Sequence, residues 1–234
     1  MRLKLLAVDT LHVERAALAA EFQQATGRPL RRAGSLAAMA LLACRRCTQS
    51  EQWPQDQPRE ALPTLLLWHT PSVIAEEAAR LLTMMLHDRE AVMPFDFLAS
   101  QPALLGVTLH PHFPELSNAI CMPWVDEDGT AIWQRSLLLA AHWLADKACQ
   151  RVLCVHLERD TDGLQAYALS LSMQDGGPQA IAELQLGPAS ATAETRAARD
   201  FVARLTRWLQ TPGLHPLRLD GDGIRVRASV KSAV

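Results

Sequence analysis

Apolar residues recur along the chain in two patterns, short runs of four to eight residues and longer stretches with helical spacing. The short runs predict strands and the longer stretches predict helices, with Gly27 ending the first helix. The expected strands are 2–9, 64–69, 115–122, 151–158, 164–173, 179–186, 214–219 and 223–230. The expected helices are 12–27, 35–47, 71–87, a short helix late in 92–109, 130–148 and 192–210.

Strands that alternate with helices predict an α/β protein in which helices are layered on a mixed sheet. Near the C-terminus, the sequence "QDGGP" predicts a hairpin between strands 164–173 and 179–186. The helix at 130–148 is apolar around most of its circumference, which is typical of a helix buried on several sides. We expect a single domain over residues 1–234, with a flexible polar loop at about 48–60.

Composition narrows the class of protein. The 234 residues are 49% hydrophobic and 21% charged, which fits a globular domain. A net charge of −2 and a pI near 6.4 give no electrostatic reason to expect nucleic acid or an anionic membrane as partner. The apolar run before Asp9 is too short for a signal peptide core, and no run approaches a membrane span. We therefore expect a cytoplasmic protein.

The stretch "LHPHFPELSNAICMPWVDEDGT", residues 109–130, concentrates side chains that can carry chemistry. His110, His112 and Cys121 are possible metal ligands, but prolines make the first part a turn, and no carboxylate stands at a recognisable ligand spacing. A solvated loop with ordinary histidines is the alternative, and no metal is expected. The acidic run 126–128 is explained by its place before a helix, where carboxylates are stabilised.

Cys121 also admits a catalytic interpretation. A cysteine at the end of a strand, just before a buried helix, is where many acyl-transfer enzymes place their nucleophile. The other cysteines, Cys44, Cys47, Cys149 and Cys154, have no disulfide framework spacing and are expected to be reduced and mostly buried. The C-x-x-C pair at 44–47 lies inside a helical pattern, which favours a structural role.

Five segments in order resemble the N-terminal half of a β-ketoacyl synthase of the thiolase fold. They are "RRAGSLAAMALLAC", "LPTLLLW", "VMPFDFLASQPALLGVTL", "ELSNAICM" and "SLLLAAHWLADKACQRVLCVHLE". The resemblance covers roughly residues 28–175. Within this class the chain is most similar to the small chain length factor subunits that accompany a full ketosynthase in type II polyketide and aryl polyene pathways.

The resemblance implies half of a thiolase-like fold and a heterodimer with a full-length β-ketoacyl synthase. It implies that residues 95–122 dock on that partner and help to wall its acyl tunnel, in a polyketide or fatty-acid-like pathway. No cofactor is implied, and an acyl carrier protein would bind transiently. The residues that it places at the interface or tunnel wall are Phe95, Phe97, Leu98, Leu104, Leu105, Leu116, Asn118 and Ile120.

The chain departs from the family at the catalytic residues. When the buried helices are aligned, the nucleophile should fall near 129–132, but Gly129, Thr130 and Ala131 hold no thiol. Aligning the preceding strand instead brings Cys121 near the position, but the helix then lies about ten residues too far downstream. The two histidines that the family takes from its C-terminal half have no counterparts in this sequence. We therefore expect a non-catalytic subunit with a vestigial nucleophile region.

Two further hypotheses remain open. A stand-alone acyltransferase or thioesterase would use Cys121 with His110 or His112, and a homodimeric acyl-binding protein would need no synthase partner. A basic cluster would steer an acidic acyl carrier protein, or would simply be a solvated surface. The cluster consists of Arg28, Arg31, Arg32, Arg45 and Arg46.

Overall fold

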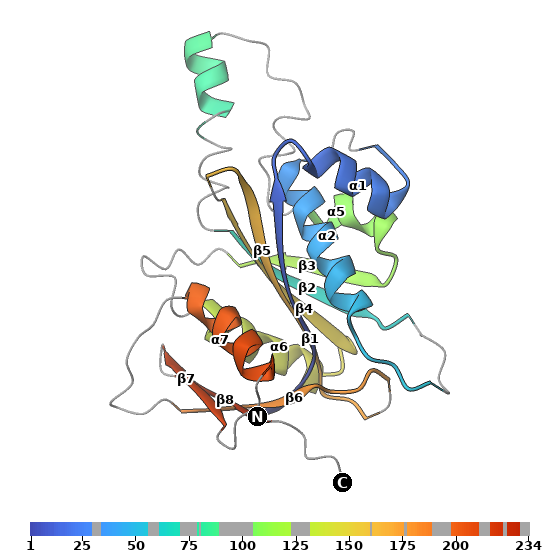
Figure 1. Cartoon of the computed structure of the whole chain (residues 1–234), viewed down its shortest axis with the longest axis vertical. Helices are drawn as coiled ribbons and strands as arrows, with labels where there is room; N and C mark the ends of the chain where they lie inside the picture. Colours follow the sequence, from blue (N-terminus) through green and yellow to red (C-terminus); the bar gives the residue numbers. More distant parts are fainter. Residues whose placement is uncertain are drawn as a thin grey trace.

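The computed structural model shows how these segments are arranged (Figure 1). It describes residues 1–29, 34–55, 61–70, 79, 81–88, 105–122, 132–159, 161–175, 177–188, 198–210, 216–221 and 224–229. The strands are β1 (Arg2–Glu14), β2 (Thr64–His69), β3 (Leu116–Cys121), β4 (Arg151–Arg159), β5 (Gly163–Ser172), β6 (Ala182–Pro188), β7 (Leu217–Gly221) and β8 (Ile224–Ser229). The helices are α1 (Leu18–Thr26), α2 (Ser35–Gln49), α5 (Leu105–Leu109), α6 (Ile132–Ala145) and α7 (Ala198–Gln210), with a π-helical turn Met84–Asp88 and a 3-10 turn His110–His112.

The described strands form one mixed sheet of eight strands in the order β3-β2-β4-β5-β1-β6-β8-β7. β2 runs parallel to both of its neighbours, β3 and β4, whereas every other pair is antiparallel. The carboxyl ends of the three parallel strands therefore meet at one end of the sheet, where α/β proteins commonly place their sites. β3 is the outermost strand on that side.

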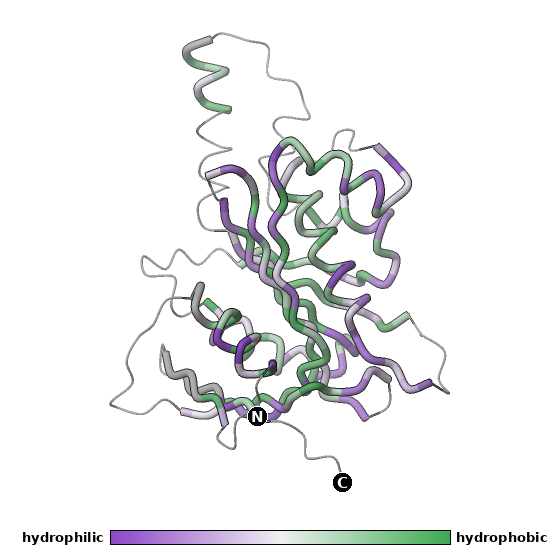
Figure 2. Tube along the Cα trace, viewed as in Figure 1, coloured by the Kyte–Doolittle hydropathy of each residue, from purple (hydrophilic) through white to green (hydrophobic). Residues whose placement is uncertain are grey.

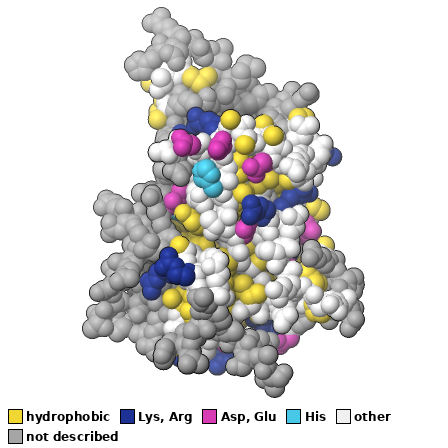
Figure 3. All heavy atoms as spheres, viewed as in Figure 1, with side chains coloured by type: hydrophobic (Ala, Val, Ile, Leu, Met, Phe, Trp, Pro, Cys, Tyr) yellow, Lys and Arg dark blue, Asp and Glu magenta, His cyan; other side chains and the backbone are white. Residues whose placement is uncertain are grey.

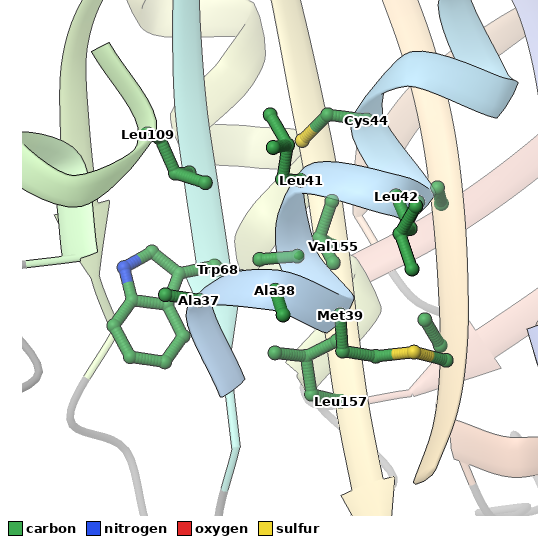
Figure 4. Close-up of a cluster of buried hydrophobic side chains, with 14 of the residues drawn as sticks. Ala37, Ala38, Met39, Leu41, Leu42, Cys44, Trp68, Leu109, Val155 and Leu157 are labelled. Atoms are coloured by element: carbon green, nitrogen blue, oxygen red, sulfur yellow. The ribbon is translucent and has the colours of Figure 1, made fainter. Parts of the chain in front are cut away.

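Helices cover both faces of the sheet, which confirms the layered α/β arrangement. α1, α2 and α5 lie on one face, and α6 and α7 lie on the other. The central strands are hydrophobic along most of their length, as strands covered on both sides should be (Figure 2). In the hydrophobic core on the α2 side of the sheet, side chains of α2 such as Met39 and Leu41 lie over side chains of β2 and β4, among them Trp68, Val155 and Leu157 (Figure 4).

The first strand is longer than predicted, and the helix that was expected to begin at residue 12 begins at Leu18. Leu11 and Val13 are buried while their neighbours are not, so the two-residue period of the strand continues past residue 9. Pairing with β5 extends to Glu14 opposite Gly163. A Cβ at Gly163 would stand 2.2 Å from the Val13 carbonyl oxygen, so this close strand approach requires glycine.

The predicted hairpin between the fifth and sixth strands is wrong. β1 lies between them and pairs antiparallel with both, so that Lys4 faces Ser172 on one side and Glu183 on the other. The Gly-rich connection therefore crosses over β1 instead of making a tight turn. The last two strands, β7 and β8, do pair antiparallel as expected.

The predicted flexible loop at 48–60 is wrong in its first part. α2 continues to Gln49, Glu51 is only 2% exposed, and Gln52 makes a β-bridge with Gln179. A buried ion pair between Glu51 and Arg151 holds this segment against the sheet. Residues 56–60 lie outside the described residues.

Two predicted helices are described only in part. Of the helix expected at 71–87, residues 71–78 and 80 lie outside the described residues, and the last turn is a π-helix. The helix expected at 192–210 is described from Ala198.

Candidate functional site: the open edge of β3

β3 forms an edge of the sheet and, among the described strands, pairs with β2 alone. The Met122 N–H donates to the Trp68 carbonyl over 2.9 Å, so the backbone N–H of Met122 faces β2. Because alternate residues of a strand face opposite sides, Ala119 and Cys121 turn their N–H groups to the open edge. The Ala119 N–H donates instead to the Asn118 side-chain oxygen over 2.8 Å. The Asn118 side chain thus accepts the hydrogen bond that the carbonyl of a neighbouring strand would otherwise accept.

The short helix α5 packs directly on this edge strand. A Cβ at Gly106 would lie 3.0 Å from the Ala119 Cβ, so helix and strand approach closely there. Val107, the next residue, is 70% exposed. A strand edge that pairs with no other described strand, and an exposed apolar side chain on the helix packed against that strand, are typical of a surface that another chain covers.

The predicted interface residues fall into three groups. Asn118 is exposed and Ile120 is half-buried, as an edge position allows. Leu105 and Leu116 are 5% and 4% exposed and belong to the core on the α2 side, so in this chain they pack internally. Outside the described residues lie Phe95, Phe97, Leu98 and Leu104.

Cys121 lies at the end of the edge strand. It is the last residue of β3, whereas α6, which begins at Ile132, packs on the face of the sheet opposite to the one that Cys121 faces. Its side chain packs with the core on the α2 side, and burial raises its pKa to about 11. At neutral pH it is a thiol, and the thiolate is the reactive form. Gly129, Thr130 and Ala131 lie outside the described residues.

The histidines of the same stretch stand at the opposite end of β3 from Cys121. His110 and His112 form a 3-10 turn before the strand starts at Leu116. Five residue steps of about 3.3 Å separate the first and last residues of the strand. The structure therefore does not bring Cys121 to either histidine, and the described residues contain no group of three potential ligands that could hold a metal ion.

The C-x-x-C pair lies in α2 with both thiols buried in the core. Burial raises the pKa of Cys44 to about 12 and also raises that of Cys47, where the neighbouring Cys44, Glu51 and Asp9 add to the effect. Burial likewise raises the pKa of Cys149 and Cys154. All five cysteines are free, as predicted.

The structure brings part of the predicted basic cluster together around the His110–His112 turn. Arg45 donates to the His112 carbonyl over 3.3 Å, and Arg46 forms an ion pair with Asp9 at 3.0 Å. Arg28 is exposed at the end of α1, while Arg31 and Arg32 lie outside the described residues. On the face drawn in Figure 3, the coloured acidic and basic side chains are interspersed.

The charge of this cluster acts on His112. Partial burial lowers the pKa of its imidazole, and the positive charges of Arg28 and Arg45 lower it further.

We expect the Arg45→Gln variant to move the His112 pKa upward, toward the ordinary value of about 6.5, because one of the repelling charges is removed. A pH titration of the imidazole C–H signals by NMR measures this. An unchanged or lower pKa in the variant would show that Arg45 does not act on the ring.

A buried histidine pair at the carboxyl ends of β2 and β4 was not predicted. His69 and His156 face each other in the strand register and are 3% and 4% exposed. Their Nδ1 atoms are 3.1 Å apart, and the His156 Nε2 lies 2.8 Å from a Glu158 oxygen. The sequence marks the two histidines only by their places in two strongly apolar predicted strands, and the pairing of these strands is seen only in the structure.

The two rings meet edge to edge. Their planes differ by 12°, and their centroids are 5.2 Å apart, only 2.1 Å more than the two nitrogens. This geometry suits an in-plane N–H···N hydrogen bond. With both rings neutral, His156 donates to the Glu158 carboxylate and accepts from His69. Cys121 packs with the core on the α2 side, whereas the His156 ring meets Trp133 of α6, so Cys121 and this pair lie on opposite faces of the sheet.

The described strands and helices define the thiolase-like α/β fold of β-ketoacyl synthases, in half-length form. No family model and no curated protein sequence matches the chain. It is similar to a chain in the complex of the ketosynthase ApeO with its chain length factor ApeC from Xenorhabdus doucetiae. The TM-score is 0.60 at 16% identity, over 98% of this chain and 99% of that chain.

Two further complexes show the same fold. The ishigamide ketosynthase/chain length factor matches with a TM-score of 0.57 and 10% identity, over 90% of this chain and 74% of that chain. The type II polyketide synthase complex AntDE:AntF, a ketosynthase with its acyl carrier protein, matches with a TM-score of 0.56 and 10% identity, over 81% and 69%. In the part of the chain that the structure describes, no helix is long and apolar enough to span a membrane.

Proposed function

We propose that this protein is a non-catalytic, chain length factor type subunit that forms a heterodimer with an active β-ketoacyl synthase. The open edge of β3 is the observation that carries the proposal. A strand edge without a partner in its own sheet is suited to pair with a strand of another chain. Asn118 on the strand and Val107 on the helix packed against it are both exposed and so available to a docking partner.

The docked subunit would help to shape the acyl tunnel of its partner and so limit the length of the growing chain. The residues proposed for the interface or tunnel wall are Phe95, Phe97, Leu98, Leu104, Asn118 and Ile120. The pathway would be of the type II polyketide or fatty-acid-like kind, of which aryl polyene synthesis is an example, in the cytoplasm. An acyl carrier protein would visit transiently through Arg28 and Arg45, which stand near each other at the His112 turn.

Loss of catalysis is part of the proposal. The described residues place no thiol at the start of α6, and the thiol nearest in sequence, Cys121, is protonated and faces away from the buried histidines. The active partner would supply all of the condensation chemistry, and this subunit would need no cofactor.

Co-expression with a full-length β-ketoacyl synthase from the same organism tests the proposal. We expect a stable 1:1 complex in size-exclusion chromatography with light scattering, with an interface of about 1,600 Å² or more. A monomer that does not bind the ketosynthase would refute it. A homodimer that excludes the ketosynthase would favour the acyl-binding alternative.

We expect no acylation of Cys121 when the isolated protein is incubated with an acyl thioester at neutral pH. A thiol with a pKa of about 11 is almost entirely protonated there, and the protonated form is a poor nucleophile. Intact-mass spectrometry with peptide mapping measures the modification, and Cys121→Ala is the control. Acyl transfer that is lost in Cys121→Ala would establish the Cys-dependent enzyme instead.

A further inference from the structure

The His110–His112 turn meets two helices that come from distant parts of the chain. The Phe22 ring of α1 contacts the His112 ring edge to face, with centroids 5.3 Å apart and planes at 79°. Arg45, from α2, donates to the His112 carbonyl over 3.3 Å. The imidazole is therefore held between α1 and α2, with a guanidinium group at its own backbone.

A second arginine is fixed at the end of α1. Gly27 ends the helix in the left-handed conformation, with φ of 70°, and the Arg28 N–H donates to the Thr26 hydroxyl over 3.1 Å. Partial burial lowers the pKa of His112, and the charges of Arg28 and Arg45 lower it further. Both cations therefore lie close enough to act on the ring.

The charges of these two arginines are not compensated. In the part of the chain that the structure describes, neither Arg28 nor Arg45 forms an ion pair, and the printed partner of the Arg45 side chain is a neutral carbonyl group. The next residue, Arg46, differs, because it pairs with Asp9 at 3.0 Å. Like charges gathered around one ring repel each other, so an anion bound there would stabilise the cluster.

The number and arrangement of the donors favour a phosphoryl group over a single carboxylate. A guanidinium presents a planar fork of N–H donors that matches the oxygens of either group. Here the donors come from three elements, and a carboxylate offers only two oxygens to them. A phosphoryl group offers three oxygens and carries nearly two negative charges at neutral pH, which equals the charge of the two arginines.

We propose that Arg28, Arg45 and His112 form a binding site for a phosphoryl group, such as that of a small phosphate ester. The two guanidinium groups hold the phosphoryl oxygens, and the imidazole, when protonated, donates to the same group. His110 and Glu115 are the titratable neighbours on the segment of His112, and the site uses neither. All three residues belong to one chain, so this proposal goes beyond the heterodimer and does not depend on it.

Titration of the full chain with inorganic phosphate tests the proposal, at constant ionic strength and about pH 7.5. We expect a saturable 1:1 shift of the His112 imidazole C–H signals in NMR spectra. Arg28→Gln and Arg45→Gln should each weaken phosphate binding at least about tenfold, because each removes a charge-assisted hydrogen bond. The matched control is Arg46→Gln, which removes a charge already paired with Asp9 and should bind phosphate as the unmodified protein does.

A second measurement uses the coupling between the anion and the imidazole. Sulfate remains a dianion at mildly acidic pH, and saturating sulfate should raise the pKa of His112 because it offsets the two arginine charges. Thermodynamic linkage requires that protonation of His112 tightens sulfate binding by the same factor. A His112 pKa that sulfate leaves unchanged would overturn the proposal.

Three further results would also overturn it. They are the absence of a saturable shift, equal weakening by Arg46→Gln and Arg45→Gln, and binding of the dicarboxylate succinate as tight as that of phosphate. Arg28 is exposed, so Arg28→Gln should fold normally, as circular dichroism can verify, and it tests the site even if Arg45→Gln does not fold. Glycerol phosphate and a neutral phosphoserine peptide, compared in the same titration, show whether the phosphoryl group belongs to a small ester or to a protein. Because the heterodimer is assayed in phosphate-free buffer, either proposal can fail alone.

Discussion

Replacing Arg151 by methionine should lower the free energy of unfolding by about 3–5 kcal/mol, the cost of leaving one charge of a buried pair alone. The Arg151 guanidinium lies 3.1 Å from one Glu51 oxygen and 3.3 Å from the other. The two side chains are 5% and 1% exposed. Without the cation, the Glu51 carboxylate keeps only the hydrogen bond from Ser170, at 2.6 Å, among the described residues.

Urea unfolding followed by far-UV circular dichroism measures the loss. The double variant with Glu51→Met and Arg151→Met should recover most of it, because no uncompensated charge remains. Arg46→Met is the matched control. Its ion pair with Asp9 has side-chain exposures of 52% and 17%, and should contribute only about 0–1 kcal/mol. Equal losses from Arg151→Met and Arg46→Met would show that burial does not decide the strength of this pair.

The same ion pair shows where sequence reasoning reaches its limit. "TQSEQWPQDQPRE" reads as a polar surface loop, since nothing local marks Glu51 for burial. Its partners, Arg151 and Ser170, come from β4 and β5, about a hundred residues later. Local composition cannot predict such a contact, because only the order of strands in the sheet brings these residues together.

Strand order also explains the misplaced hairpin. The pattern identified both strands correctly, and a Gly-rich connection favours a tight turn between them. The insertion of β1 between β5 and β6 is instead a property of the whole sheet. By contrast, β2 and β4 were predicted well, because strands covered on both faces are apolar over their full length and stand out from their surroundings.

The candidate site was predicted in part. The strand 115–122 was identified, and the structure places it at the edge of the sheet. The chemistry of its neighbours was harder to interpret. His110, His112 and Cys121 are close in sequence but lie at opposite ends of β3, whereas His69 and His156 are far apart in sequence and share a hydrogen bond.

Placing a charge on α5, the helix packed against β3, should weaken the heterodimer. We expect Val107→Asp to raise the dissociation constant of the complex at least tenfold, which corresponds to about 1.4 kcal/mol. Val107 is 70% exposed in the isolated chain, so the variant should fold normally, while docking would bury an unpaired carboxylate. Asn118→Lys should act similarly, because a lysine on an edge strand opposes pairing with another strand.

The control for this experiment is Leu138→Asp, which puts the same charge on an exposed leucine of α6. It should form the heterodimer with unchanged affinity, because α6 packs on the sheet face opposite to α5. Surface plasmon resonance with immobilised ketosynthase measures the three affinities. If Leu138→Asp weakened the complex while Val107→Asp did not, the partner would dock on α6, and the open edge of β3 would need another explanation. Strand pairing as the basis of assembly requires that Val107→Asp weakens the complex and that Leu138→Asp does not.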